Sequence, residues 1–461
     1  AALNDQLNWL PPALPGALEA FLPALREIGS RVYAAQNSTD MANQLEQLQR
    51  ARKETSDLRQ SQALNESHSG QRFAQALEVW ERLLQEKTTS LEGQYKSEFI
   101  PNAYVVGAPL VDESKMFKGR QDVFAALKRE LASQTQQRPT LMLFGPRRSG
   151  KTSTLRQLPS RLGPDFIPVE IDLLSAVTSN DVTGLMQGMV TQIQDKALVT
   201  RRVKLAKLQL ELLTADPYRA FLEWLKEQEA ALGPRLILLN FDEFERLEDM
   251  IAEGRLDARI FQWLRSLIQN HPKVVVLLSG SHTLEELSPA WSDALINVRT
   301  LRIGPLQENE ARELITAPIP DFPLQYEEDA VQAILHATGR KPYLIQAICR
   351  DLVHYLNEEK RRLAARADVE KAFDTILQTT AAYFNEIWTS RDTDDDQRRV
   401  LRLLAAPDEP TLSENQLLQQ ANLPSPNALR KLTWRDVIEK TDGGYRLASP
   451  ILGRWVRERA L

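Results

Sequence analysis

An eight-residue loop, Gly145-Pro-Arg-Arg-Ser-Gly-Lys-Thr152, constrains this chain more than any other stretch of its sequence. It follows a short apolar run, Thr140–Phe144, and precedes a helical pattern, Thr152–Leu162. Glycines let backbone N–H groups converge on an anion, the lysine adds positive charge, and the following helix presents its N-terminal dipole. The sequence therefore predicts a phosphate-binding turn between a buried strand and a helix.

The loop predicts a site for the phosphates of ATP or GTP. Lys151 is expected to neutralise the terminal phosphates during catalysis, and Thr152 to offer its hydroxyl to Mg²⁺. The residues of this segment that we expect to contact the nucleotide are Gly145, Pro146, Arg147, Arg148, Ser149, Gly150, Lys151, Thr152 and Ser153.

A second apolar run, Leu236–Phe241, ends in the acidic pair Asp242-Glu243. A carboxylate at the end of a buried strand is suited to hold Mg²⁺ through water. The adjacent Glu243 is suited to orient or deprotonate the attacking water, which makes it the candidate catalytic base. The pair favours an ATPase that activates water over a kinase or a small GTPase.

A third apolar run, Val274–Leu278, leads into Ser279-Gly-Ser281-His282. If its strand lies between the other two, a polar residue at its end meets the γ-phosphate or the lytic water. Ser281 and Ser279 are the candidates, and His282 is more simply an ordinary loop histidine.

Apolar runs and helical patterns alternate through this part of the chain, with further expected strands at Phe166–Asp172 and Val298–Ile303. Continuous apolar strands separated by helices indicate a parallel sheet covered on both faces. The predicted fold is α/β, a parallel-sheet P-loop ATPase core with helical additions on both sides.

Four regions are expected. Residues 1–98 form an N-terminal helical region, 99–306 the ATPase core, 307–391 a helical lid and 392–461 a winged helix-turn-helix. In the first, Leu10–Pro15 opens a helix running to Tyr33, Met41–Leu64 forms a second helix, and Phe73–Leu84 belongs to a third. This region is either a packing cap, which we favour, or a partner-binding hairpin. An acidic run, Asp392–Asp396, is expected to link the lid to the last region.

Composition excludes several classes of protein. The net charge of −5 gives no general attraction to nucleic acid or anionic lipid. The single cysteine, Cys349, permits no internal disulfide and fits a cytoplasmic location. No apolar run approaches the roughly 20 residues that cross a bilayer. The chain begins at Ala1 without a methionine, which suggests a processed chain or a fragment.

The combined motifs resemble those of STAND-type signal-transduction ATPases and of the archaeal-ATPase and origin-initiator branch of the AAA+ class. The resemblance rests on five segments and the C-terminal pattern and covers residues 100–461. The segments are Phe117–Arg120, Gly145–Thr152, Leu239–Leu247, Leu278–Thr283 and Thr338–Tyr343.

The resemblance implies further site residues. Gly119 and Arg120 would lie near the adenine, and Gly339–Pro342 would correspond to the lid motif that senses the nucleotide. That motif is usually Gly-x-Pro, but here it is Gly-Arg-Lys-Pro, so either Pro342 packs on adenine, or Arg340 acts as a sensor, or neither does. Such proteins close on ADP and open on ATP, often with homo-oligomerisation and release of a protein effector.

We therefore expect an ATP- and Mg²⁺-dependent switch in prokaryotic signalling or defence, with slow hydrolysis and a protein effector or sensor as partner. A DNA-binding AAA+ initiator or transposition-type regulator is the alternative, and a nucleotide-binding scaffold without turnover is a third. Residues 425–461 carry eight Lys/Arg and four acids, a net of +4, which is light for a DNA reader. We favour an intramolecular or protein-binding role for this region.

Overall fold

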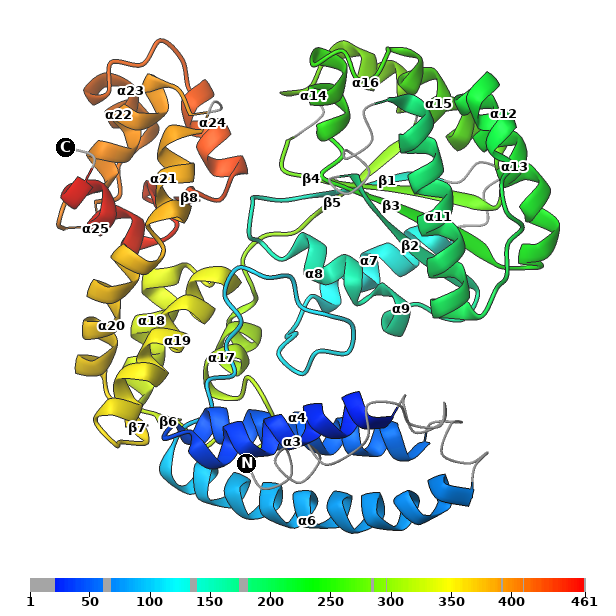
Figure 1. Ribbon diagram of the computed structural model, residues 1–461. Helices are drawn as coiled ribbons and strands as arrows, with labels where there is room; N and C mark the ends of the chain where they lie inside the picture. The colour runs from blue at the N-terminus through cyan, green and yellow to red at the C-terminus, as the bar shows by residue number, and fades with distance from the viewer. Residues whose placement is uncertain are drawn as a thin grey trace. The chain divides into compact units, whose positions relative to one another are not determined.

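The computed structural model (Figure 1) describes residues 21–60, 68–132, 139–173, 181–282, 286–295, 297–390, 393–408 and 410–459. The chain divides into two compact units. The first contains the described residues up to Pro101 together with Asn357–Arg362, and the second contains the remainder. The expected helix start at Leu10–Pro15 and the first residue of the acidic run, Asp392, lie outside the described residues.

The first unit contains three helices, α3 (Phe21–Asn37), α4 (Met41–Gln60) and α6 (His68–Glu98). Asp40 begins α4 by accepting the backbone N–H groups of Ala42 and Asn43, at 3.1 and 3.3 Å. The third helix contains the predicted segment Phe73–Leu84 and continues to Glu98. It continues because Thr88 and Leu91 extend its buried stripe.

The second unit is built on a five-stranded sheet in the order β2-β3-β4-β1-β5, with every neighbouring pair parallel. The prediction of a parallel sheet is confirmed. The strands are β1 (Thr140–Phe144), β2 (Phe166–Asp172), β3 (Leu236–Asp242), β4 (Val274–Gly280) and β5 (Val298–Arg302). Because β4 lies between β1 and β3, the three sequence motifs lie side by side at one edge of the sheet.

Helices cover both faces of this sheet (Figure 1). On one face, Phe221 and Trp263 pack edge to face, 5.2 Å between ring centroids, against buried strand residues such as Phe241. On the other face, Phe124 and Leu155 pack on Leu141 and Leu143. The helices of this region are α7 (Gln121–Ala132), α8 (Lys151–Arg156), α9 (Leu158–Arg161), α11 (Val182–Arg201), α12 (Leu210–Ala215), α13 (Pro217–Leu232), α14 (Arg246–Ala252), α15 (Arg259–Asn270) and α16 (Pro289–Ala294).

The lid segment, residues 308–389, follows the sheet. Its helices are α17 (Glu308–Thr316), α18 (Glu328–Thr338), α19 (Pro342–Glu358), α20 (Arg366–Thr379) and α21 (Ala381–Thr389). Two short parallel strands, β6 (Gln325–Tyr326) and β7 (Leu363–Ala364), interrupt the purely helical pattern expected from sequence. They pair over only two residues each, which is too short for an alternation of apolar residues to reveal.

The C-terminal segment, residues 395–459, has three helices and an antiparallel hairpin in the predicted order. These are α22 (Asp395–Leu404), α23 (Glu414–Gln420), α24 (Asn427–Trp434), β8 (Ile438–Thr441) and β9 (Gly444–Leu447), and α25 (Pro450–Arg459) follows. Ser413 caps α23 in a capping box with Gln416. Its assignment as a winged helix stays a prediction from this order of elements.

The lid and C-terminal segments meet at the end of α18. Gly339 ends that helix with a left-handed backbone, φ 55°, and the Ser449 hydroxyl donates to the Thr338 carbonyl at 2.9 Å. A Cβ atom on Gly339 would lie 1.7 Å from the Ala448 carbonyl oxygen. Only glycine allows the two backbones to approach this closely.

We predict that Gly339→Ala separates the lid and C-terminal segments. The variant combines the backbone cost of about 1 kcal/mol with a direct clash on Ala448. Gly254→Ala is the matched control, because Gly254 also has a positive φ of 73° but nothing within 4 Å of the added atom. Thermal unfolding and limited proteolysis should show a larger loss, and earlier cleavage near residue 449, for Gly339→Ala. Equal effects of the two variants would contradict this view of the contact.

Candidate nucleotide site

The phosphate-binding loop lies where β1 ends and α8 begins. Gly145 packs so closely on β5 that an added Cβ would lie 2.3 Å from the Ile303 carbonyl oxygen. Gly150 takes a left-handed backbone, φ 94°, directly before Lys151 starts the helix. The glycines thus fulfil the steric role that the sequence assigns to them.

Lys151 is buried beneath the loop. Its ammonium donates to the carbonyls of Gly145 and Pro146, at 2.8 and 2.9 Å. Burial lowers the pKa of this amine, while the carboxylates of Glu245, Asp242 and Glu243 act in the opposite direction. The lysine therefore lies among the acidic residues at the end of the sheet, at the place where the loop turns.

Thr152 and Asp242 meet as the sequence predicts. The Thr152 hydroxyl donates to Oδ2 of Asp242 at 2.6 Å, although 90 residues separate them. A hydroxyl and a carboxylate supply the oxygen donors that Mg²⁺ prefers, and Mg²⁺ on a nucleotide needs few protein ligands. Among the residues that the structure describes, no cluster of three or more His, Cys, Asp or Glu forms a separate metal site. The pair therefore fits a nucleotide-bound Mg²⁺.

Glu243, the candidate base, lies next to this pair in a left-handed backbone conformation, φ 51°. Its side chain is half-exposed, at 45%, and lies 3.5 Å from the Arg246 guanidinium. Glu243 lines the cavity and its ion pair is accessible to solvent, so the carboxylate can reorient. Such positive-φ residues are uncommon outside glycine and often mark functional turns.

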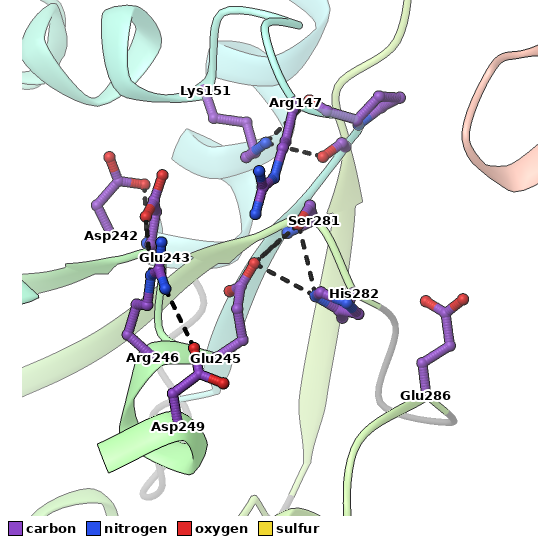
Figure 2. Close-up of polar contacts among 12 residues, drawn as sticks. Arg147, Lys151, Asp242, Glu243, Glu245, Arg246, Asp249, Ser281, His282 and Glu286 are labelled. Atoms are coloured by element: carbon purple, nitrogen blue, oxygen red, sulfur yellow. Dashed lines mark hydrogen bonds and ion pairs between the residues drawn. The ribbon is translucent and has the colours of Figure 1, made fainter. Parts of the chain in front are cut away.

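Glu245 is a residue that the sequence analysis missed. Its Oε1 accepts from both the backbone N–H and the hydroxyl of Ser281, each at 2.9 Å, and lies 3.5 Å from His282 Nδ1 (Figure 2). Burial opposes ionisation, but hydrogen bonds from His282 and Ser281 outweigh it and lower the pKa of Glu245 to about 2. A carboxylate with so low a pKa is a poor base and a good anchor.

This network fixes the end of β4. Ser281 and His282 line the cavity with their side chains held by Glu245, so the Ser281 hydroxyl is directed to the carboxylate. Ser279 is fully buried in the strand and does not line the cavity. Gly280 is needed here because a Cβ atom would lie 2.4 Å from Oε2 of Glu245. That close approach is visible only in three dimensions.

The two loop arginines extend to the lid segment. The Arg147 guanidinium lies 2.5 Å from Glu386 on α21, and Arg148 lies over the Tyr343 ring on α19, 4.5 Å from its centroid. Arg147 also lines the cavity, where Figure 2 shows it beside Lys151.

Arg120 supports the loop from beneath. It is only 4% exposed, and its guanidinium donates to the carbonyls of Ser149 and Gly304, both at 2.7 Å. Gly119 has φ 73°, and a side chain there would collide with the Glu310 carboxylate. These residues join the loop to the connection that leads into the lid segment.

Most of these side chains border one cavity of about 1200 Å³, and Ser279 is an exception. Its lining includes apolar residues: Pro109, Leu110, Phe117, Leu306, Leu314, Pro342 and Tyr343. It also includes charged and hydroxyl groups: Arg147, Lys151, Thr152, Asp242, Glu243 and Ser281. Such a combination suits a nucleotide, which has a flat base and a charged phosphate tail.

Of the remaining predicted residues, Gly119, Gly145 and Pro146 line neither of the two cavities described here. Pro342 and Ser153 line the first, and the Ser153 hydroxyl accepts the Leu110 N–H at 3.0 Å. Arg340 instead lines a second cavity of about 440 Å³, between α18 and the C-terminal segment. Its carbonyl accepts the Leu306 N–H at 3.0 Å, so its backbone holds the lid to the preceding chain.

In the described part of the chain, no helix is both long enough and apolar enough to span a membrane.

The sequence matches the family model described as novel STAND NTPase 1 over residues 110–423. A solved Walker-type ATPase of Pyrococcus abyssi superposes with a TM-score of 0.51 at 17% identity, covering 76% of this chain and 99% of that one. The Aeropyrum pernix ORC2 protein gives a TM-score of 0.42 at 14% identity, over 78% and 98% of the chains. The RuvB Holliday junction branch migration motor of Thermotoga maritima gives 0.39 at 14%, over 72% and 92%. No curated protein matches the sequence.

We predict that Glu245→Gln destabilises the protein at neutral pH. The lowered pKa corresponds to about 3 kcal/mol of stability, fully present above the unfolded pKa of about 4.3 and lost as the pH falls towards 2. The difference in thermal unfolding temperature from the wild type should therefore narrow between about pH 5 and about pH 2. Glu243→Gln, at a half-exposed neighbour, should change stability by less than about 0.5 kcal/mol. A Glu245 effect independent of pH would refute the proposed anchor.

Proposed function

Because the chain belongs to the novel STAND NTPase 1 family, we propose that it is an ATP-binding molecular switch that hydrolyses ATP slowly. The observation that carries the proposal is that loop, lid and C-terminal residues all line the larger cavity. A nucleotide there would contact the loop, the lid and the C-terminal segment at once. Whether it carries two or three phosphates could therefore bias how these segments are arranged. We place the switch in prokaryotic signalling or defence, with a protein effector or sensor as partner.

The site residues have distinct roles in this proposal. Lys151 would turn from the loop carbonyls to the terminal phosphates, and Thr152 with Asp242 would hold Mg²⁺. The ion, when bound, would neutralise phosphate charge. Glu243 would accept a proton from the attacking water, and Glu245 would hold Ser281 at the far end of the phosphate tail.

Contacts between the segments support a gated arrangement. Arg302 on β5 pairs with Asp436 of the C-terminal segment at 2.5 Å, and Arg435 lies 3.4 Å from Glu286. Partly exposed ion pairs such as these contribute only about 0–1 kcal/mol each, so they can exchange partners readily. A nucleotide shifts such an equilibrium only by its differential affinity for the two states. ATP would favour the open state, in which homo-oligomers can form.

The alternative role, DNA binding, receives less support from the C-terminal cations. Four of those described are already paired with carboxylates: Lys431 with Asp394, Arg435 with Glu286, Arg446 with Glu439 and Arg454 with Glu370. Phosphate contacts need cations that are available to the backbone of the duplex. We therefore propose that this segment makes protein contacts.

We predict that the protein binds both ADP and ATP and hydrolyses ATP slowly. Lys151→Ala should abolish binding, because it removes the buried charge among the phosphates. Glu243→Gln should retain binding and lower turnover by about 10²-fold or more. Titration calorimetry and phosphate release measure these quantities, and sedimentation with ADP or with a non-hydrolysable ATP measures assembly.

Two results would contradict this function. A nucleotide-free monomer unchanged by either nucleotide would rule out the switch. Turnover unaffected by Glu243→Gln would point to a scaffold in which hydrolysis plays no part. Salt-sensitive, ATP-dependent DNA binding would favour the alternative role.

A further inference from the structure

The two consecutive arginines of the loop both contact the lid segment, and both also border the cavity. Arg147 on the loop pairs with Glu386 on α21, and Arg148 lies on Tyr343 of α19. Resting on the proposed function, we infer that Glu386 is a specificity-determining residue, which competes with the γ-phosphate of ATP for Arg147. ADP would leave the Arg147–Glu386 ion pair intact, whereas the γ-phosphate of ATP would break it.

The position of Arg147 supports this competition. It belongs to the phosphate-binding loop, and Figure 2 shows its guanidinium beside Lys151 and directed towards the Glu243 and Ser281 side of the site. Burial opposes its charge, but the hydrogen bond and charge of Glu386, together with Glu243 and Glu245, outweigh burial and raise the pKa of the guanidinium. Arg147 is therefore within the electrostatic reach of the residues that would surround a γ-phosphate.

The chemistry of the pair allows exchange. A guanidinium binds carboxylate and phosphate oxygens with the same planar geometry, so Glu386 and a phosphate are equivalent partners. The Arg147 side chain is 60% exposed and that of Glu386 is 32% exposed, so the ion pair is hydrated and weakly held. A γ-phosphate would also bring negative charge close to Glu386 and so weaken the pair from the other side.

The helix that carries Glu386 connects this exchange to the C-terminal segment. Phe384, two residues earlier on α21, is fully buried and stacks on Trp455 of α25 with ring centroids 5.9 Å apart. Tyr383 packs on Tyr343, 4.9 Å between centroids, and Tyr343 is the ring beneath Arg148. Release of Glu386 would therefore act on the aromatic contacts that hold the lid and C-terminal segments together.

The test compares the affinities for ADP and for a non-hydrolysable ATP analogue in variants of the full chain. Glu386→Gln removes the competing charge and should raise the preference for the ATP analogue over ADP by about 3- to 10-fold. Arg147→Ala should lower that preference. In the Arg147→Ala background, Glu386→Gln should have no further effect, because the two residues act as a pair.

Glu370→Gln is the matched control. It removes a comparable half-exposed ion pair, with Arg454 at 2.8 Å, between α20 and α25 and away from the loop. It should leave the ratio of the two affinities unchanged. Thermal unfolding of each variant checks that the fold is retained.

Two outcomes distinguish this assignment from the function on which it rests. Equal changes in ADP and ATP affinity on Glu386→Gln, or additive effects in the double variant, would overturn the role of Glu386 and leave the switch proposal standing. A wild-type protein that binds neither nucleotide would overturn both.

Discussion

Parallel pairing of β1, β4 and β3 is the constraint on which the site depends. Because parallel strands all end at the same edge, the loop after β1, the acids after β3 and the serine after β4 are brought together there. The buried apolar strands hold that edge rigid, and both faces of the sheet are covered. The Thr152–Asp242 contact is the direct result, since it joins two strand ends across 90 residues of sequence.

The phosphate-binding loop also contacts segments outside the sheet. Arg120 ties it to the connection at Gly304, Arg147 and Arg148 reach the lid helices, and the lid is joined to the C-terminal segment at Gly339. Each contact is modest by itself, but together they form a continuous path of packed and paired residues. A change in phosphate number at the loop therefore has a physical route to the C-terminal segment, through elements that meet in pairs.

Much of the fold could be predicted from the sequence. All five expected strands are present in the sheet, although β5 has no continuous apolar run. The loop and the acidic strand end singled out Thr152 and Asp242, which the structure brings together. What sequence could not predict depends on long-range geometry. Glu245 reads as one more acid in an acidic stretch, and only the fold places it under Ser281, 36 residues away. Arg147 reads as a phosphate ligand, and its partner Glu386 lies 239 residues away, with no pattern to link them. The family resemblance offers Arg340 as one possible sensor of the nucleotide. In the structure Arg340 has a left-handed backbone, φ 59°, and lines the second cavity.

The proposed switch requires that nucleotide state changes how the C-terminal segment sits against the sheet. The chain has a single cysteine, Cys349, which is fully buried, so two introduced cysteines can be labelled selectively. Gln269 on α15 and Gln419 on α23 are exposed and lie in the two parts concerned. The most direct measurement is the distance distribution between spin labels at these positions with ADP and with a non-hydrolysable ATP. We predict one short distance with ADP and an added longer population with ATP. Identical distance distributions with the two nucleotides would contradict the proposed switch.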